Sequence, residues 1–384
     1  MKPWLVGTMI VSRLLTPMVG ALGQTALPSS SPVAPEPAAG SIDVNLPDAQ
    51  PVAFVVDSPV DWQVFQRKTR LAGAIRVSGV TQPNSKVQVR LAGKSLTGLV
   101  SGVWQAVPVD SMAHTYFAEL ATPAGGWYTL DIQSTVKGEP PVIQTIPHVG
   151  VGEVFVGAGQ SNSTNYGEVR TQPTSGMVTT FSGSEWRIAD DPQPGAHDRN
   201  NPKAQFGSLW PAFGDAMYAH YGVPIGVAVT GNGGTSLDLW NPDGDIFNWT
   251  LTRIQHLGPF GFRALLWHQG ESDYNTAADD YAAKLAHIIQ TARLRAGWAF
   301  PWIVAHASYE NPTLTGSAKT GAGQEAIWKL GIALPGPDTD KLVGDLRLNS
   351  GPHFTAAGLK AHGELWAVAV EAYLDPLLAK EPAK

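Results

Sequence analysis

Two residues that can carry out acyl transfer, a serine and a histidine, lie far apart in the sequence. Ser161 follows two glycines in "GEVFVGAGQSN", residues 152–162, and His353 lies in "SGPHFTAAG", residues 350–358. A serine is a weak nucleophile until a base takes its proton, and histidine is the usual base near neutral pH. The pair therefore predicts nucleophilic attack on an ester carbonyl, provided that the fold brings the two side chains together.

Donors for a developing oxyanion stand in two further polar stretches, "GNGGTS" at 231–236 and "HQGESD" at 268–273. An oxyanion needs two or three fixed donors, such as backbone N–H groups of glycines and an amide side chain. Singly, each stretch is typical of a turn or a cap, and the glutamine is equally suited to a buried structural role. The predicted donors are the amides of Ser161 and of Gly233 or Gly234, and the side chain of Gln269.

An α/β pattern begins at about residue 151, where apolar runs typical of strands alternate with stretches typical of amphipathic helices. Repeated strand–helix–strand units predict a mainly parallel sheet with helices on both faces. Such sheets bind ligands at the carboxyl ends of their strands, which is where the polar stretches above begin. The expected strands are 152–157, 223–229, 262–268 and 301–308, and the expected helices are 209–222, 278–297 and about 355–374.

The region before this pattern carries short apolar runs separated by turn residues. The alternation in "KVQVRL", residues 86–91, has a period of two, which is typical of a strand with one buried face. No part of it has the pattern of a long helix. We therefore expect a small all-β sandwich module over 45–150, followed by an α/β domain over 151–380.

The first 44 residues are expected to lie outside both domains. Residues 1–23 combine Lys2 with a mostly apolar run and small residues at its end, as an export signal does. Arg13 and Pro17 interrupt that run, which disfavours a stable membrane span. Residues 24–44 are rich in Pro, Ala and Ser and are typical of a linker. We expect an exported protein, either periplasmic or secreted.

The composition argues against several classes of function. The net charge is −6 with no basic cluster, which disfavours a nucleic-acid surface. There is no cysteine, and no His-x-His pair or HExxH helix suggests zinc, so we expect no metal and no cofactor. The oligomeric state is left open. Among 13 tryptophans, Trp210 and Trp240 near strand ends are candidates for stacking on a sugar, with packing in the core as the alternative.

The combined motifs resemble those of the SGNH hydrolase superfamily, and most of all its branch of sialate O-acetylesterases and related carbohydrate acetylesterases. "GQSN", "GGTS", "WHQGESD" and "HFTAAGLKAHG" are similar to that branch's blocks for the nucleophile, the oxyanion glycine, the oxyanion glutamine and the basic histidine. The upstream module with "DWQVFQR" is similar to the sandwich that precedes the catalytic domain there. The resemblance spans roughly residues 45–375 and implies a three-layer SGNH-type (flavodoxin-like) parallel sheet.

The resemblance implies an esterase that removes acetyl groups from an acetylated glycan. Ser161 would attack the ester, His353 would act as base, and the oxyanion would lie among the donors given above. Gln160 and Asn162, which flank the serine, are candidates for binding the substrate, as are Gly234 and the two tryptophans. No cofactor is implied.

One departure from the family pattern concerns the third catalytic group. The family usually has an aspartate three residues before the histidine, and this chain has Ser350. That acid orients the imidazole and stabilises the imidazolium, so its loss can cost several orders of magnitude in rate. Asp345 in the same loop and Glu271 in "HQGES" are two replacements, and a Ser161–His353 dyad is a third arrangement. Of these we favour the dyad or assistance from Ser350.

Other classes of function stay open at this point. The missing aspartate also suits a catalytically weak glycan-binding relative, which would bind glycan without serine-dependent turnover. The same pair suits an acyltransferase, in which a sugar acceptor would divert the acetyl group from water. A lipase-like or thioester hydrolase would need a broad apolar channel, and the sequence contains no apolar lid segment.

Overall fold

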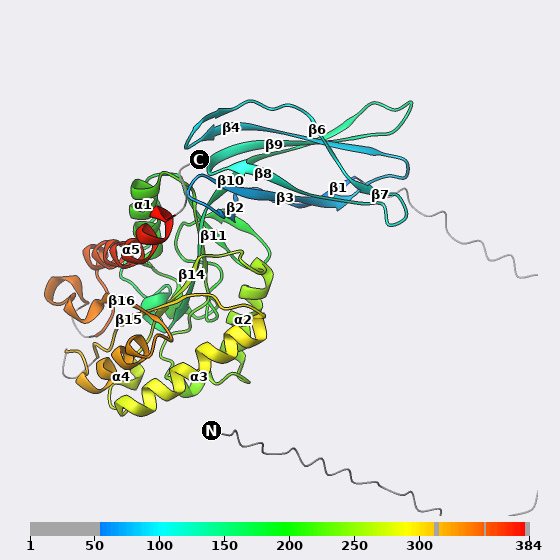
Figure 1. Ribbon diagram of the computed structural model, residues 1–384. Coiled ribbons are helices and arrows are strands. Elements are labelled where there is room, and N and C mark those ends of the chain that lie inside the picture. Colours follow the sequence, from blue (N-terminus) through cyan, green and yellow to red (C-terminus); the bar gives the residue numbers. More distant parts are fainter. Residues whose placement is uncertain (1–53, 311–314, 349–350, 381–384) are drawn as a thin grey trace, which may run out of the picture. The chain divides into compact units, whose positions relative to one another are not determined.

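The computed structural model describes residues 54–310, 315–348 and 351–380 (Figure 1). The expected export signal, 1–23, and the expected linker, 24–44, lie outside these ranges, so export stays a prediction. Within the described ranges, every helix is too short or too polar to cross a membrane.

A mainly parallel sheet forms the centre of the second half of the chain. β10 pairs in parallel with β13 on one side and β14 on the other, and β12 at one edge runs antiparallel to its neighbour β11. This confirms the parallel sheet expected from the alternating pattern. In spatial order the strands are β12 (Trp186–Ile188), β11 (Val178–Phe181), β13 (Ile225–Val229), β10 (Val142–Gly159), β14 (Ala264–His268), β15 (Trp302–His306) and β16 (Leu334–Asp338).

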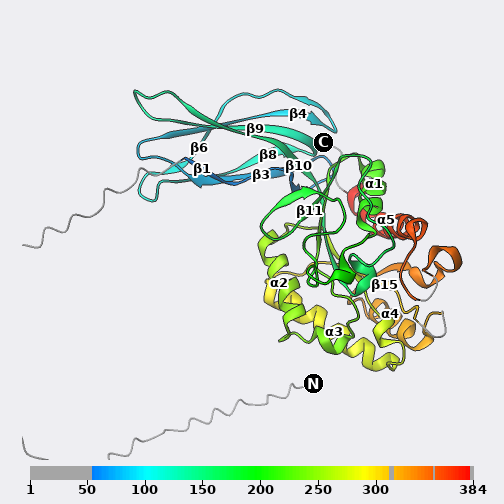
Figure 2. The same cartoon turned by 180° about the vertical axis from the view of Figure 1, so that it is seen from behind.

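Helices cover both faces of this sheet (Figure 2). Side chains alternate along a strand, so Phe155 of β10 packs in the core that contains Trp366 of α5, while Val154 and Val156 pack in the core that contains Tyr281 of α3. The three-layer α/β fold is therefore confirmed. The helices are α1 (Trp210–Tyr221), α2 (Asp245–Leu257), α3 (Ala278–Ala296), α4 (Ala318–Lys329) and α5 (Ala356–Ala379).

Two antiparallel sheets form the N-terminal module. The first has the order β1 (Val55–Ser58), β3 (Ala72–Val80), β8 (Thr115–Pro123), β7 (Val109–Asp110). In the second, β4 (Lys86–Ser95) pairs with β5 (Gly98–Val100), β6 (Gln105–Val107) and β9 (Gly125–Thr135). Buried residues of both sheets, among them Ile75 and Val89, share one hydrophobic core. The all-β sandwich expected here is thus present.

β10 belongs to both parts of the chain. Its first half pairs antiparallel with β9, and β2 (Gln63–Gln66) pairs with it near residue 150, before its second half enters the parallel sheet. The boundary expected between residues 150 and 151 therefore falls inside this strand. Short 3₁₀ helices follow several strands: η1 (Ser161–Ser163), η2 (Pro202–Ala204), η3 (Leu237–Trp240), η4 (Glu271–Asp273), η5 (Thr339–Lys341) and η6 (Gly344–Leu346).

A buried ion cluster fixes β10 at this junction. Glu153, which is fully buried, accepts from Arg67 Nε at 2.7 Å, Arg263 Nε at 2.8 Å and Gln66 Nε2 at 2.9 Å. Burial alone would raise the pKa of Glu153, but the charges and hydrogen bonds of Arg263 and Arg67 outweigh it and hold the pKa below its usual value. Through Arg67 the cluster connects β10 to the segment after β2, and through Arg263 it connects β10 to the segment before β14.

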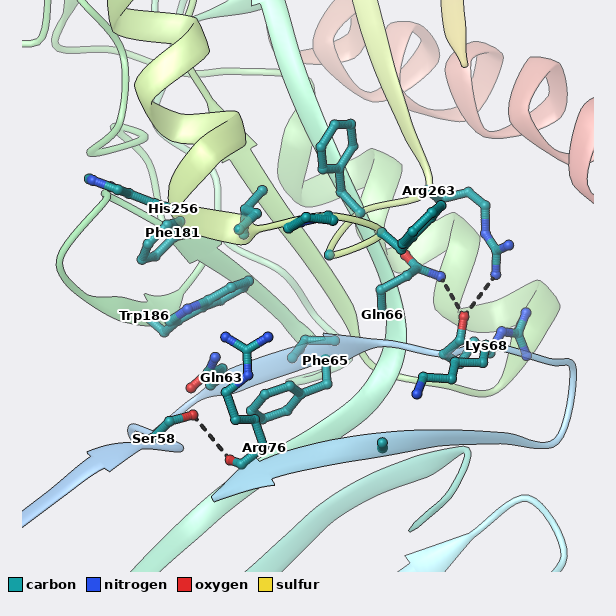
Figure 3. Close-up of a pocket in the computed structure, with 18 of the residues that line it drawn as sticks. Ser58, Gln63, Phe65, Gln66, Lys68, Arg76, Phe181, Trp186, His256 and Arg263 are labelled. Atoms are coloured by element: carbon teal, nitrogen blue, oxygen red, sulfur yellow. Dashed lines mark hydrogen bonds between the residues drawn. The ribbon is translucent and has the colours of Figure 1, made fainter. Parts of the chain in front are cut away.

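A cavity of about 930 Å³ lies close to this cluster (Figure 3). Gln63 and Phe65 of β2 and Arg76 of β3 line it from the module, and Trp186 and His256 line it from the α/β part. Ser161, His353 and Glu271 are absent from its lining residues, so this cavity is not the predicted catalytic site.

We expect Glu153→Gln to lower the free energy of unfolding by about 3–5 kcal/mol, because it leaves the buried Arg67 guanidinium without its counter-charge. Urea unfolding of the full chain measures this. Glu119→Gln, which removes only an exposed pair with Lys68, should cost no more than about 1 kcal/mol. Equal losses in the two variants would contradict the role of the cluster.

Candidate active site

Ser161 lies at the carboxyl end of β10, where two glycines allow the chain to leave the sheet. Gly159 has φ +127°, and a Cβ there would lie 2.0 Å from the carbonyl oxygen of His268. A Cβ on Gly157 would lie 2.1 Å from the Trp210 ring. Both positions therefore need glycine. Ser161 begins η1 and is 4% exposed, and the N–H of a residue at a helix start has no intrahelical acceptor.

The loop that carries His353 is held against the segment that carries Ser161. Asn162 Nδ2 donates to the carbonyl oxygen of Pro352 at 3.2 Å. The ring of Tyr166, just after η1, lies 5.3 Å from the half-buried His353 ring. The structure thus brings together the serine and histidine segments that the sequence analysis selected.

Glu271, at the start of η4, is the carboxylate whose charge acts on His353. It is 2% exposed, and its Oε1 accepts from Asn162 Nδ2 at 2.7 Å and lies 3.1 Å from His268 Nε2. Its Oε2 is buried with no hydrogen-bond partner among the described residues. Burial would raise the pKa of Glu271, but the charge of His268 and its hydrogen bond lower it below the usual value. Glu271 is therefore ionised, and its Oε2 is available for a further interaction.

The other two candidates for the third group differ from Glu271. Asp345 is exposed on η6, and the contact it makes is through its carbonyl oxygen, which accepts from the Thr355 hydroxyl at 2.8 Å. Ser350 lies outside the described residues. The charges and burial thus favour Glu271 over Asp345, and no observation bears on Ser350.

Burial lowers the pKa of His353, Glu271 raises it and the charge of Arg347 lowers it, so that the pKa lies below the ordinary value of 6.5. The ring is therefore neutral near neutral pH. A neutral imidazole is the form that can accept a proton.

Two buried histidines continue the network behind Glu271. Trp366 Nε1 donates to His362 Nε2 at 3.2 Å, and His362 Nε2 lies 3.1 Å from His268 Nδ1. An indole N–H only donates, so His362 Nε2 is an acceptor and His268 Nδ1 carries a proton. Burial and the charges of His268 and Arg347 also hold the His362 pKa well below its usual value.

One proton must then lie between His268 and Glu271. His268 Nε2 and Glu271 Oε1 are 3.1 Å apart, and an ionised carboxylate only accepts. That proton joins the two side chains in one hydrogen bond.

Two of the predicted oxyanion donors, Gly233 and Gln269, have protein partners in this structure. The N–H of Gly233 donates to Asp198 Oδ2 at 2.8 Å. Gln269 is fully buried, and its Nε2 donates to Asp273 Oδ2 at 2.6 Å and to the carbonyl oxygen of Thr235 at 3.1 Å. This corrects the expectation of a free glutamine donor, because its amide holds neighbouring segments together. Gly234 is exposed, with φ +69° and open space around it.

Four predicted substrate contacts lie in the interior. Trp210 and Trp240 are each 1% exposed, and their N–H groups donate to Ser163 and Thr235. An indole so deeply buried has no face for a sugar, so the stacking expectation is wrong for both. Gln160 is 2% exposed and accepts from the N–H of Ser272. Asn162 is 6% exposed and holds Glu271 and the His353 loop. These two side chains position the site from within the protein.

Sequence reasoning missed Asp198 and Tyr166. The Tyr166 hydroxyl donates to Asp198 Oδ2 at 2.7 Å, and burial together with the carboxylate raises the Tyr166 pKa. Asp198 lies in a loop without periodicity or motif, so no sequence signal marked it. His268 and His362 were inside the quoted motifs, but only the packing of α5 against β14 shows that they touch.

Residues 151–370, more than half of the chain, match the model of a family described as "Carbohydrate esterase, sialic acid-specific acetylesterase". The chain belongs to this family. The protein is accordingly a carboxylic ester hydrolase that removes acetyl groups from carbohydrate. The expected resemblance is thereby confirmed.

One solved structure with a TM-score above 0.5 shows the same fold at low sequence identity, and a second is similar over a smaller part of this chain. A carbohydrate acetylesterase from Xanthomonas citri is 21% identical, with 83% of this chain and 74% of that chain covered and a TM-score of 0.54. A protein from Arabidopsis thaliana is 20% identical, with 58% of this chain and 98% of that chain covered and a TM-score of 0.48. No curated protein matches the chain.

For this carbohydrate esterase we expect ¹⁵N NMR at neutral pH to show a proton on Nδ1 of His268 and on Nδ1 alone of His362. The reason is the proton count along the hydrogen-bond chain. The His268→Gln spectrum assigns the signals. An unprotonated Nδ1 on His268, or a proton on Nε2 of His362, would contradict this chain of hydrogen bonds.

Proposed function

We propose that this esterase removes O-acetyl groups from a glycan with Ser161 as nucleophile and His353 as base. The observation that carries the proposal is the position of Asn162. Its side chain, next to the serine, donates one hydrogen bond to Glu271 and another to Pro352. Pro352 lies 190 positions further along the sequence, directly before His353. A positioned nucleophile and base next to a buried carboxylate form the arrangement that acyl transfer requires.

The reaction runs in two steps. Ser161 Oγ attacks the acetyl carbonyl carbon while His353 takes its proton. The tetrahedral intermediate collapses, the bond from the carbonyl carbon to the sugar oxygen breaks, and His353 returns the proton to that oxygen. Water then attacks the acetyl-serine with His353 again as base. The bond between the acetyl carbon and Ser161 Oγ breaks, His353 returns the proton to Oγ, and acetate leaves.

We assign the third role to Glu271. When His353 takes the proton of Ser161 it becomes an imidazolium, and the unpartnered Oε2 of Glu271 is the buried negative charge in its field. Asn162 and His268 hold the other oxygen, so the carboxylate is fixed before the charge appears. This replaces the dyad that the sequence alone favoured.

For the oxyanion we propose the N–H groups of Ser161 and Gly233. In the absence of substrate, the Gly233 N–H donates to Asp198. The carbonyl oxygen of the ester must therefore displace that carboxylate when the substrate binds. Gln269 donates to Asp273 and to Thr235, and it thereby supports the loop that contains Gly233. The acetylated glycan as substrate rests on the family and on the carbohydrate acetylesterase from Xanthomonas citri, which has a similar fold.

The first test is acetate release from 4-nitrophenyl acetate and from acetylated glycans. We expect kcat to fall by at least about 10³-fold in Ser161→Ala and His353→Ala, and by about 10²- to 10⁴-fold in Glu271→Gln, because each removes one part of a unit. Asp345→Asn is the matched control and should keep wild-type kcat, because its carboxylate is exposed.

Four outcomes would contradict parts of the proposal. If the wild type released no more acetate than Ser161→Ala, a glycan-binding protein without serine-dependent turnover would become the favoured alternative. A loss of kcat in Asp345→Asn with no loss in Glu271→Gln would assign the third catalytic role to Asp345 instead of Glu271. Preference for C8 over C2 nitrophenyl esters, or diversion of acetyl to sugar acceptors, would favour the lipase-like or the transferase alternative.

The pH profile gives a separate prediction. His353 must be neutral to act, so kcat/KM should decline as the pH falls through its pKa, with the acid limb below 6.5. Glu271 raises this pKa, so Glu271→Gln should move the limb to still lower pH in its residual activity. A limb at or above 6.5, or a shift upward in the variant, would be inconsistent with this assignment.

A further inference from the structure

One oxygen of Asp198 marks a place where two hydrogen-bond donors converge beside the active site. Asp198 Oδ2 accepts from the N–H of Gly233 at 2.8 Å and from the hydroxyl of Tyr166 at 2.7 Å. Gly233 lies in the loop after β13, and Tyr166 lies in the segment after η1, which follows β10. Because β10 and β13 are neighbouring parallel strands, the two donors come from adjacent positions at one edge of the sheet.

The Tyr166 hydroxyl can act only as a donor toward this place. Asn201 Nδ2 donates to the hydroxyl oxygen at 3.3 Å, which leaves the single hydroxyl proton for Asp198. Burial, together with the hydrogen bond to Asp198, raises the pKa of Tyr166 above its ordinary value of 10.0. The hydroxyl therefore keeps its proton at every pH at which a histidine base works.

The position of the Tyr166 ring connects this hydroxyl with both the base and the oxyanion loop. The ring centre lies 5.3 Å from that of His353. A Cβ added to Gly233 would lie 2.3 Å from the hydroxyl oxygen, so the hydroxyl packs directly on this glycine. Gly231 of the same loop packs on Ser163 of η1, where an added Cβ would lie 2.1 Å from Oγ. The hydroxyl is thus close to the proposed base and to a proposed oxyanion donor.

We propose that Tyr166 is a further catalytic residue, whose hydroxyl donates to the oxyanion together with the N–H groups of Ser161 and Gly233. The proposed function requires the carbonyl oxygen of the ester to displace Asp198 from the Gly233 N–H. An oxygen in that place accepts from Tyr166 as well, because both donors converge on it. The inference rests on the proposed function for the acyl transfer, and on this geometry for the additional donor.

The tyrosine supplies the side-chain donor that the sequence analysis expects of Gln269. An oxyanion needs two or three fixed donors. Gln269 is fully buried, and its amide is engaged by Asp273 and Thr235. Tyr166 is half-buried, and the substrate itself removes the acceptor of its proton when it displaces Asp198. Two backbone donors and one side-chain donor then complete the set.

Asp198 acts in this arrangement as a competitor that the ester must displace. A charged oxygen binds N–H and O–H donors more strongly than a neutral carbonyl oxygen does. The ester oxygen is neutral when it arrives, and it becomes negatively charged only when Ser161 attacks. The carboxylate therefore weakens binding of the uncharged ester, while the donors are strongest for the charge that develops in the reaction.

The test compares 4-nitrophenyl acetate with its thionoester, in which sulfur replaces the carbonyl oxygen, on the full chain. Sulfur is a weaker hydrogen-bond acceptor than oxygen, so loss of an oxyanion donor costs the thionoester less. Tyr166→Phe keeps the ring beside His353 and removes only the hydroxyl. We expect it to lower kcat/KM for the oxoester by about 10²-fold, and the oxoester-to-thionoester ratio of kcat/KM by at least about tenfold.

Tyr221→Phe is the matched control, because the Tyr221 hydroxyl also donates to a carboxylate, that of Asp375, at 2.8 Å, but on α1 and α5. It should leave both values of kcat/KM and their ratio unchanged. An equal loss on the two substrates in Tyr166→Phe would mean that the hydroxyl supports the loop without contacting the oxyanion, and would overturn the proposal. An unchanged kcat/KM for the oxoester would overturn it as well.

Asp198→Asn gives a second readout of the shared place. The substitution keeps the shape of the side chain and removes its charge, so KM for 4-nitrophenyl acetate should fall by at least about threefold. An unchanged or higher KM would contradict the shared place, even if Tyr166→Phe failed to fold. Wild-type turnover in Ser161→Ala would refute the proposed nucleophile, and the substrate ratio in Tyr166→Phe would still decide whether the hydroxyl binds the oxyanion.

Discussion

The site depends on one buried carboxylate, Glu271, whose two oxygens have different surroundings. Oε1 is bonded to Asn162 and faces His268, while Oε2 has no hydrogen-bond partner among the described residues. A buried charge left in this state is costly unless another charge balances it. In the proposed mechanism, an imidazolium at His353 supplies that balance during the reaction. The interaction that would stabilise the carboxylate would then also serve the proposed catalysis.

The register of the sheet explains why these groups meet. Gly159 of β10 pairs with His268 of β14, so the chain segments that follow the two strands leave the sheet side by side. Ser161 follows one strand and Glu271 follows the other within three residues. α5 packs with its His362 against His268, and His353 precedes that helix. Three segments that are distant in sequence thus converge because two parallel strands are neighbours.

The sequence predicted the sheet, the helices and the segments of Ser161 and His353, because hydrophobic periodicity and turn residues are local signals. It favoured a dyad or Ser350 over Glu271, since the case for Glu271 depends on burial that only packing determines. It failed for Trp210, whose ring fills the space beside Gly157, a contact between distant positions. It also missed Asp198, because a loop carboxylate that bonds the Gly233 N–H has no motif of its own.

The central claim is that Ser161 carries the acetyl group between the glycan and water. The most direct measurement is an acid quench of the wild-type chain during turnover of an acetylated substrate, followed by peptide mapping by mass spectrometry. The account predicts an acetyl group on the peptide that contains Ser161, and on no peptide of the Ser161→Ala chain. An unmodified Ser161 peptide under conditions where acetylation outpaces hydrolysis, or an acetyl group on another residue, would contradict it.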